Sequence, residues 1–177
     1  MAANTTGADN VAVGAYALDA NTTGGSGVAV GKGALGSNTT ATGNTAVGIN
    51  AALSNTTGTS NVAIGSHALY TNTTAAGNTS VGYNSLNSSN SAGNVAVGVS
   101  ALFATTSGAQ NTAVGSYALD ANTTAANNVA VGYDALGANT TGASNTAVGH
   151  SALDANTTAS YNSAFGASAL GANTTGS

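Results

Sequence analysis

The sequence predicts an all-β fold, a parallel β-solenoid (β-roll or β-helix) built from ten 17-residue repeats. The first observation is a Val-Gly pair, or a close variant, that returns every 17 residues with one step of 16. The second is that the residues before each Gly alternate as in a short strand. Self-similarity at a fixed period is the sequence signature of a repeat architecture. We therefore expect one solenoid domain over residues 1–177, with one 16-residue copy near residues 78–94.

The strand of each repeat is the segment that runs from an Asn to the Gly. In 128–132, Val129 and Val131 share one face, while Asn128, Ala130 and Gly132 share the other. We expect the Val face to point into the coil, and its third-position residues to form one inward column: Val13, Val30, Val47, Ile64, Val81, Val97, Val114, Val131, Val148 and Phe165. The Ala130 column must also be crowded, because only Ala and Ser occur in it.

A corner and a second apolar anchor follow each strand. The Gly permits a sharp turn, and the next two positions vary freely, which is typical of a surface that faces solvent or a partner. An Ala-Leu pair then supplies a second inward column: Leu18, Leu35, Leu69, Leu86, Leu102, Leu119, Leu136, Leu153 and Leu170, with Leu53 one place out of step. This segment is either a second strand or one helical turn per coil, and it is too short for the sequence to decide.

The Asn-Thr-Thr triplets have the composition of a turn. They are also formal N-glycosylation acceptors, although a repeated turn creates such sequons automatically. We expect Asn128 and its equivalents to form a ladder inside the coil. That leaves the triplet residues as the better glycosylation candidates: Asn4, Asn21, Asn38, Asn55, Asn72, Asn122, Asn139, Asn156 and Asn173. One copy lacks the triplet over Asn87–Gly93, and its missing residue is expected in an outward loop.

Composition excludes several classes of partner. Only 3% of the residues are charged, the net charge is −4, and Lys32 is the single cation. Nothing in the chain could therefore neutralise nucleic-acid phosphates or bind anionic lipid through a basic patch. No apolar run is long enough to insert into a membrane, and no signal peptide is visible at the N-terminus. Few large apolar residues are typical of disorder, but the strict period argues for order.

The repeat Asn-x-Ala-Val/Ile-Gly-x-x-Ala resembles the head repeats (haemagglutinin-like repeats) of trimeric autotransporter adhesins, which also occur in phage and bacterial fibre proteins. Residues 61–68 are the best match, and the resemblance covers all ten copies. It implies a left-handed parallel β-roll, with three chains side by side on a cell or virion surface. The repeats of that family are typically shorter and lack the Leu-x-x-Asn-Thr-Thr insertion.

Residues that carry chemistry are few. His67 and His150, and the five Asp residues Asp9, Asp19, Asp120, Asp134 and Asp154, show no ligand spacing. Asp19, Asp120 and Asp154 share a column, but their coils are not adjacent. No Gly pattern matches a phosphate loop. We therefore expect no catalytic residue, cofactor or metal. Four tyrosines form either an outward stripe for carbohydrate or protein, or scattered surface aromatics: Tyr16, Tyr83, Tyr117 and Tyr133.

These observations predict a structural or adhesive fibre segment with no enzymatic activity. The resemblance to adhesin head repeats implies a location outside the cell or on a cell or virion surface. Side-chain burial alone is too small to order a coil, so we expect coil-to-coil backbone bonds and contact between chains. The expected partners are further copies, as a trimer or an end-to-end filament, and a cell-surface receptor or glycan. Neither terminal repeat carries a capping device, which favours continued stacking. The alternative is an ice-binding solenoid that uses columns of Thr.

Overall fold

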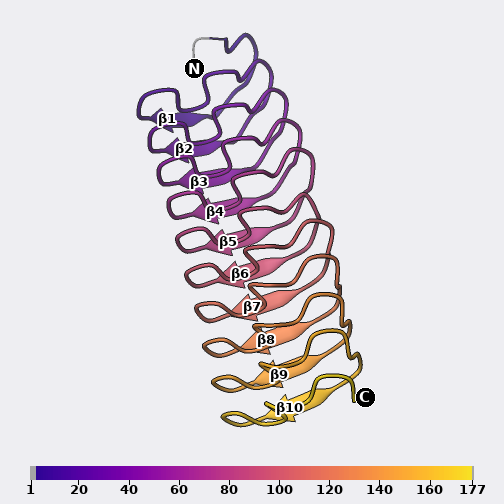
Figure 1. Ribbon diagram of the computed structural model, residues 1–177. Helices are drawn as coiled ribbons and strands as arrows, with labels where there is room; N and C mark the ends of the chain where they lie inside the picture. The colour runs from indigo at the N-terminus through magenta and orange to yellow at the C-terminus, as the bar shows by residue number, and fades with distance from the viewer. Residues whose placement is uncertain (1–2, 177) are drawn as a thin grey trace.

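The computed structural model describes residues 3–176 as one stack of coils (Figure 1). Each coil contributes a three-residue strand, and the described residues contain no helix. The strands form one ten-stranded sheet in sequence order. They are β1 (Val11–Val13), β2 (Val28–Val30), β3 (Thr45–Val47), β4 (Val62–Ile64), β5 (Thr79–Val81), β6 (Val95–Val97), β7 (Thr112–Val114), β8 (Val129–Val131), β9 (Thr146–Val148) and β10 (Ser163–Phe165). The predicted parallel β-solenoid is confirmed.

Every strand pairs with the next one in register. Thr112 pairs with Val129 and Val114 with Val131 across β7 and β8. We number the coils 1 to 10 by their strands, so that coil 7 is residues 105–121. Coil 6, residues 89–104, is the coil with 16 residues. The pairing of Val81 with Val97 shows that the missing residue leaves the register of the sheet unchanged.

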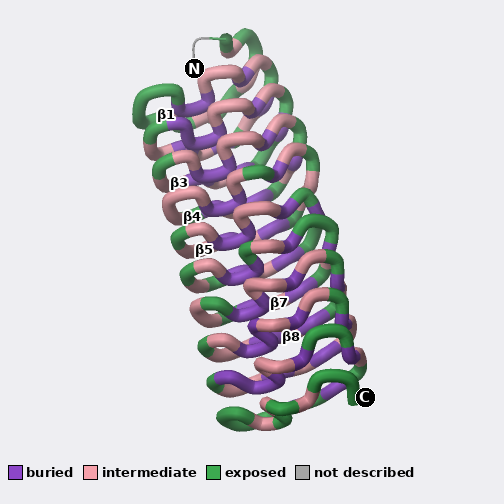
Figure 2. Tube along the Cα trace, viewed as in Figure 1, coloured by how far each residue is buried: buried purple, intermediate pink, exposed green. Residues whose placement is uncertain are grey.

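The prediction for the strand faces is wrong. The central Ala of each strand points inward, and Ala113 and Ala130 are fully buried. The Val column points outward instead: Val13 is 57% exposed, Ile64 is 40% exposed and Phe165 is 70% exposed. Figure 2 shows a buried stripe along the centres of the strands. The larger apolar residue is therefore on the outside of this sheet.

The interior is too narrow for Val at the strand centre. Ser80 replaces the central Ala in β5, and Ser85 replaces the Ala that follows the corner. The two hydroxyl oxygens lie 2.6 Å apart, in hydrogen-bond contact across the coil. Both positions are otherwise held by Ala, so the two walls of each coil meet through methyl groups. Close-packed interiors do not tolerate added methyl groups without strain.

The Leu column fills the remaining apolar interior, as predicted. Leu119 and Leu136 are fully buried, whereas Leu170 is half exposed in coil 10, the last described coil. The Ala-Leu segment is neither a strand nor a helical turn, because every second residue has a positive φ. In coil 7 these residues are Tyr117 (φ 62) and Leu119 (φ 53). Burial of the Leu side chain, about 1.5–3 kcal/mol, offsets the cost of the left-handed backbone.

Coil 3 accommodates its displaced Leu on the outside. Ala52 occupies the buried left-handed position with φ 48. Leu53 is half-buried and lies against coil 2, where a Cβ added at Gly36 would be 2.9 Å from its Cδ1 atom. Glycine at that place in coil 2 therefore leaves room for the Leu53 side chain.

The invariant Gly column forms the corner after each strand. Gly115 has φ 141, which L-residues rarely adopt. A Cβ added there would lie within 3.0 Å of the carbonyl group of Gly132 in the next coil. Backbone strain and close stacking thus both require glycine at this corner.

The predicted internal ladder of Asn128 and its equivalents is confirmed. Asn128 is fully buried, and its backbone N–H donates to Asn111 Oδ1 at 2.9 Å. Its own Oδ1 accepts the backbone N–H of Asn145 at 2.8 Å, while its Nδ2 donates to the carbonyl of Gly142 at 2.9 Å. The ladder satisfies buried polar groups that would otherwise be costly.

Candidate functional site

The outer side of the sheet is a regular surface without charge. We call it the Val face; it consists of the first and third residues of each strand. Its first column begins with two Val residues, then alternates Thr with Val and ends in Ser: Val11, Val28, Thr45, Val62, Thr79, Val95, Thr112, Val129, Thr146 and Ser163. The third-position column is the one predicted to lie inside. All these residues are half-buried or exposed, and none is charged. Contiguous exposed apolar surface of this kind marks an interaction site.

The Thr columns of the triplets divide into two kinds. In most coils the first Thr of the triplet donates its hydroxyl to a carbonyl of the next coil, as Thr22 does to Thr39 at 3.0 Å. The second Thr is exposed, as at Thr23 and Thr40. The second column therefore presents the more exposed row of hydroxyl groups. Coil 6 has no residue at this place, and coil 7 has Ser107.

The triplet Asn side chains lie inside the rod, so the reasoning that made them the better glycosylation candidates is wrong. Asn55 and Asn139 are fully buried, and Asn55 Nδ2 donates to Asn38 Oδ1 at 3.2 Å and to the carbonyl of Gly58 at 2.9 Å. The same burial applies to Asn21, Asn38, Asn72, Asn122 and Asn156. Asn4 and Asn173, in coil 1 and after coil 10, are partly exposed. A glycan on a buried amide would break this second ladder, since Nδ2 is the atom that carries both bonds.

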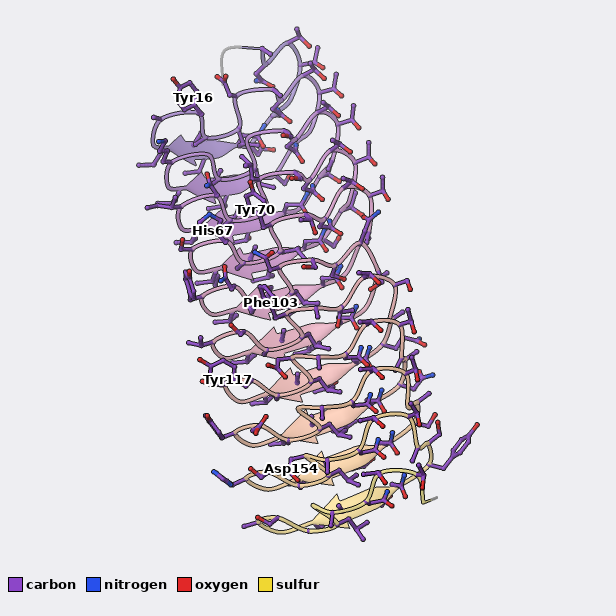
Figure 3. All side chains as sticks on the ribbon, viewed as in Figure 1. Tyr16, His67, Tyr70, Phe103, Tyr117 and Asp154 are labelled. Carbon is purple, nitrogen blue, oxygen red and sulfur yellow. The ribbon has the colours of Figure 1, made fainter. Side chains whose placement is uncertain are left out.

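The variable pair after each Gly forms one exposed corner of the rod. Figure 3 shows Tyr16 and Tyr117 at this corner, far apart along the stack. The four tyrosines of the predicted stripe are exposed, but among the described residues only two of them meet: the Tyr117 and Tyr133 rings lie 5.8 Å apart, edge to face. His150 continues this group, stacked on Tyr133 at 5.4 Å. The stripe is therefore local to coils 7–9.

Three carboxylates lie beside this aromatic group in consecutive coils. Asp120 and Asp154 occupy the same column in coils 7 and 9, and coil 8 has Gly137 between them. The Asp134 carboxylate lies over Gly137, where a Cβ would collide with it. Asp134 thus fills the gap in the column, which the sequence reasoning had missed because Asp134 comes from the corner position.

Proximity of these carboxylates changes their acidity. Partial burial raises the pKa of Asp120, and the negative charge of Asp134 raises it further. Partial burial and the charge of Asp154 also raise the pKa of Asp134, while nearby His150 lowers it. Both groups favour the protonated form in the folded chain more than in the unfolded chain.

This acidic group should make the rod less stable as pH rises. Since the pKa values of Asp120 and Asp134 are raised on folding, stability is lost from the ordinary Asp pKa upward. We expect Asp134→Asn to increase stability at pH 7 by less than about 1 kcal/mol, because the site is only partly buried and solvent screens its charges, and to change stability little at acidic pH. Thermal melting followed by circular dichroism at both pH values measures this difference. Thr124→Asn, a change in the same coil at an exposed residue that carries no charge, is the control; equal pH profiles for the two variants would contradict the prediction.

Other reactive residues remain apart. His67 lies in coil 4, where Nδ1 is 2.9 Å from the Ser66 hydroxyl and the ring is 5.2 Å from that of Tyr70. It is thus separated from His150 by several coils. Residues 3–176 contain no group of three or more His, Cys, Asp or Glu side chains that could hold a metal ion, and they enclose no pocket.

Comparisons of the chain with protein-family models, curated proteins and solved structures found no match. Over the described part of the chain, no helix has the length and apolar character needed to cross a membrane. The function is therefore inferred from the exposed faces of the rod. The sequence did contain one signal for the Val face: a strand centre restricted to Ala and Ser indicates a close opposite wall.

Proposed function

We propose that this chain is a structural and adhesive segment of an extracellular fibre, without catalytic activity, whose copies pack side by side through the Val face. The observation that carries the proposal is the outward position of the Val, Ile and Thr columns along the sheet. The resemblance of the repeat to adhesin head repeats supports the same function. A cell or virion surface is the location that this function implies.

The partner that fits the Val face is a second copy of this chain. Identical columns at identical spacing are complementary to one another, and neither copy brings a charge into the contact. β-Branched side chains are already stiff, so little side-chain freedom is lost on packing. Ten strands at about 4.8 Å and three residues at about 3.3 Å give a face on the order of 48 Å by 10 Å. Two such faces bury roughly 1,000 Å², the lower end for a specific interface.

Charge placed on the Val face tests the proposal. The variant carries Val97→Asp, Val114→Asp and Val131→Asp, and the matched control places the same three charges on the exposed Thr column. The control substitutions are Thr124→Asp, Thr141→Asp and Thr158→Asp. Sedimentation of all three proteins should give oligomers or filaments for the wild type and the control, and monomers for the Val-face variant. Circular dichroism checks that each protein is folded.

A monomeric wild type at high micromolar concentration would overturn the side-by-side assembly, and so would a Val-face variant that stays assembled. The sedimentation coefficient also distinguishes a pair from a trimer or an end-to-end filament. Adhesion is measured separately, as binding of the assembled rod to immobilised glycans or cells. The exposed corner of coils 7–9, with its Tyr, His and Asp side chains, is the proposed contact for such a receptor.

Ice binding is the second candidate, favoured by the exposed column of second-position Thr hydroxyls. These residues recur in successive coils, about every 4.8 Å, except that coil 6 has no residue at this place and coil 7 has Ser107. Thermal hysteresis of the wild type and of the Thr-column variant separates the two functions. Hysteresis that the three Asp substitutions abolish would support ice binding, and its absence from the wild type would remove this candidate.

A further inference from the structure

The joint between coils 5 and 6 differs from the other joints of the rod. Coil 6 lacks one residue, and the gap falls at the exposed second-Thr position. Ser89 occupies the place of the triplet Asn, and buried Ser91 occupies the place of the Gly or Ala that follows the two Thr residues. The Ser91 hydroxyl donates to the carbonyl of Gly108 at 2.6 Å. As predicted, the missing residue belongs to an outward loop, but its effects reach the interior.

The two amide ladders each lose a bond at this joint, although the backbone N–H of Asn94 still donates to Asn78 Oδ1 at 2.9 Å. Asn72 Nδ2 donates to Asn55 Oδ1 at 2.7 Å, but Asn72 Oδ1 is buried without a partner. The corresponding donor of coil 6 would come from Ser89, whose side chain is too short. In coil 4, Asn61 Nδ2 donates to the carbonyl of Ala75 at 2.9 Å, whereas its coil 5 equivalent, Asn78 Nδ2, is buried without a partner. Both of these atoms belong to coil 5, and their usual partners would come from coil 6. The third buried side-chain atom without a partner among the described residues, Asn156 Oδ1, lies in coil 10, the last coil of the stack.

Backbone bonding is also weaker on this side. The backbone N–H groups of Thr56 and Thr57 donate to the carbonyl of Thr73 at 2.9 and 3.2 Å. One coil later, those of Thr73 and Thr74 donate to the side chain of exposed Asn90, with Oδ1 at 3.0 and 3.1 Å. A single exposed side chain thus replaces a main-chain carbonyl.

The sheet side of the same joint remains intact. The backbone N–H of Thr79 donates to the carbonyl of Asn94 at 2.9 Å, and that of Gly98 donates to the carbonyl of Val81 at 2.8 Å. The joint is therefore weakened along one edge only.

We propose that the joint between coils 5 and 6 is a hydrated weak point at which the rod opens first. Water bound between coils supplies the missing partners of Asn72 Oδ1 and Asn78 Nδ2, since one water can donate to an oxygen and accept from an N–H. The stability of a solenoid is approximately a sum over its coils and their interfaces, so its weakest interface divides it. The loop edge separates there while the sheet holds, which gives a stiff rod one defined place to bend.

Hydrogen exchange of the full chain tests this inference independently of the fibre proposal. The amides of Thr73 and Thr74 should exchange at least about tenfold faster than those of the equivalent pairs Thr56/Thr57 and Thr140/Thr141, because buried groups without partners lower the free energy of opening. Equal protection at the two sets of amides would overturn the proposal.

Two variants move the weak point. The repaired variant combines Ser89→Asn and Asn90→Thr with one Thr inserted before Ser91, which restores 17 residues and the ladder. Exchange at Thr73 and Thr74 should then slow to the rate of the other coils. The reciprocal variant copies the defect into coil 8 through Asn122→Ser, Thr123→Asn and deletion of Thr124. Exchange should then accelerate at Thr106 and Ser107, and unchanged rates in a folded variant of either kind would contradict the proposal.

Discussion

Replacing Gly115 by alanine is expected to lower the free energy of unfolding by about 2–6 kcal/mol, the sum of backbone strain and overpacking. Two independent features of the corner produce this effect. The φ of 141 is one that L-residues rarely adopt, and the new Cβ would lie within 3.0 Å of the backbone of Gly132. Neither coil can move away, because each is bonded to its other neighbour along the whole sheet.

Gly166→Ala is the matched control for this prediction. Gly166 has a similar φ of 121, but a Cβ added there meets nothing within 4 Å. Only the strain term remains, so the expected loss is about 1–3 kcal/mol. Chemical denaturation of both variants measures the difference, which corresponds to the stacking contact. Equal losses would mean that contact between successive glycines does not restrict this corner.

Leu119→Ala is the second large effect, with an expected loss of about 2–5 kcal/mol from the deleted methyl groups and the cavity that they leave. Leu119 is fully buried between neighbouring coils, and coil 7 has no other large apolar side chain inside. The backbone at this position is left-handed, with φ 53. Alanine is possible in that conformation, since Ala52 adopts it in coil 3, so the loss reports burial rather than misfolding.

Tyr117→Ser controls for the backbone conformation. Tyr117 lies in the same coil with a similar φ of 62, but its ring is 40% exposed. The Tyr117→Ser substitution should lower the free energy of unfolding by less than about 1 kcal/mol, mainly through loss of the exposed edge contact with Tyr133. Melting temperatures of the two variants give the comparison. If the Tyr117 variant were as unstable as the Leu119 variant, the assignment of Leu119 to the interior and of Tyr117 to the surface would be contradicted.

Several features of the rod follow from repetition and local chemistry. The period and the Gly corners predicted parallel coils in register, and the Leu column was correctly placed inside. The break at Asn87–Gly93 was correctly assigned to an outward loop, because a register shift in the sheet would have moved every side chain of β6 to the other face. A fixed repeat period is enough to predict these features, because none of them depends on how close the opposite wall of the coil lies.

Which side chains point inward was decided by the distances between the opposite walls of a coil and between neighbouring coils. The sequence of one repeat does not give these distances. Val131 is the more apolar residue and Ala130 the smaller one, and Ala130 is inside because the opposite wall leaves room only for a methyl group. The triplet residue Asn139 has the composition of a surface turn, yet its amide bonds to the neighbouring coil inside the rod. Asp134 joins the carboxylate column because Gly137 leaves space over its own Cα. Hydrophobicity and turn propensity are properties of a residue, whereas the width of the coil and contacts between columns arise only when the chain closes on itself.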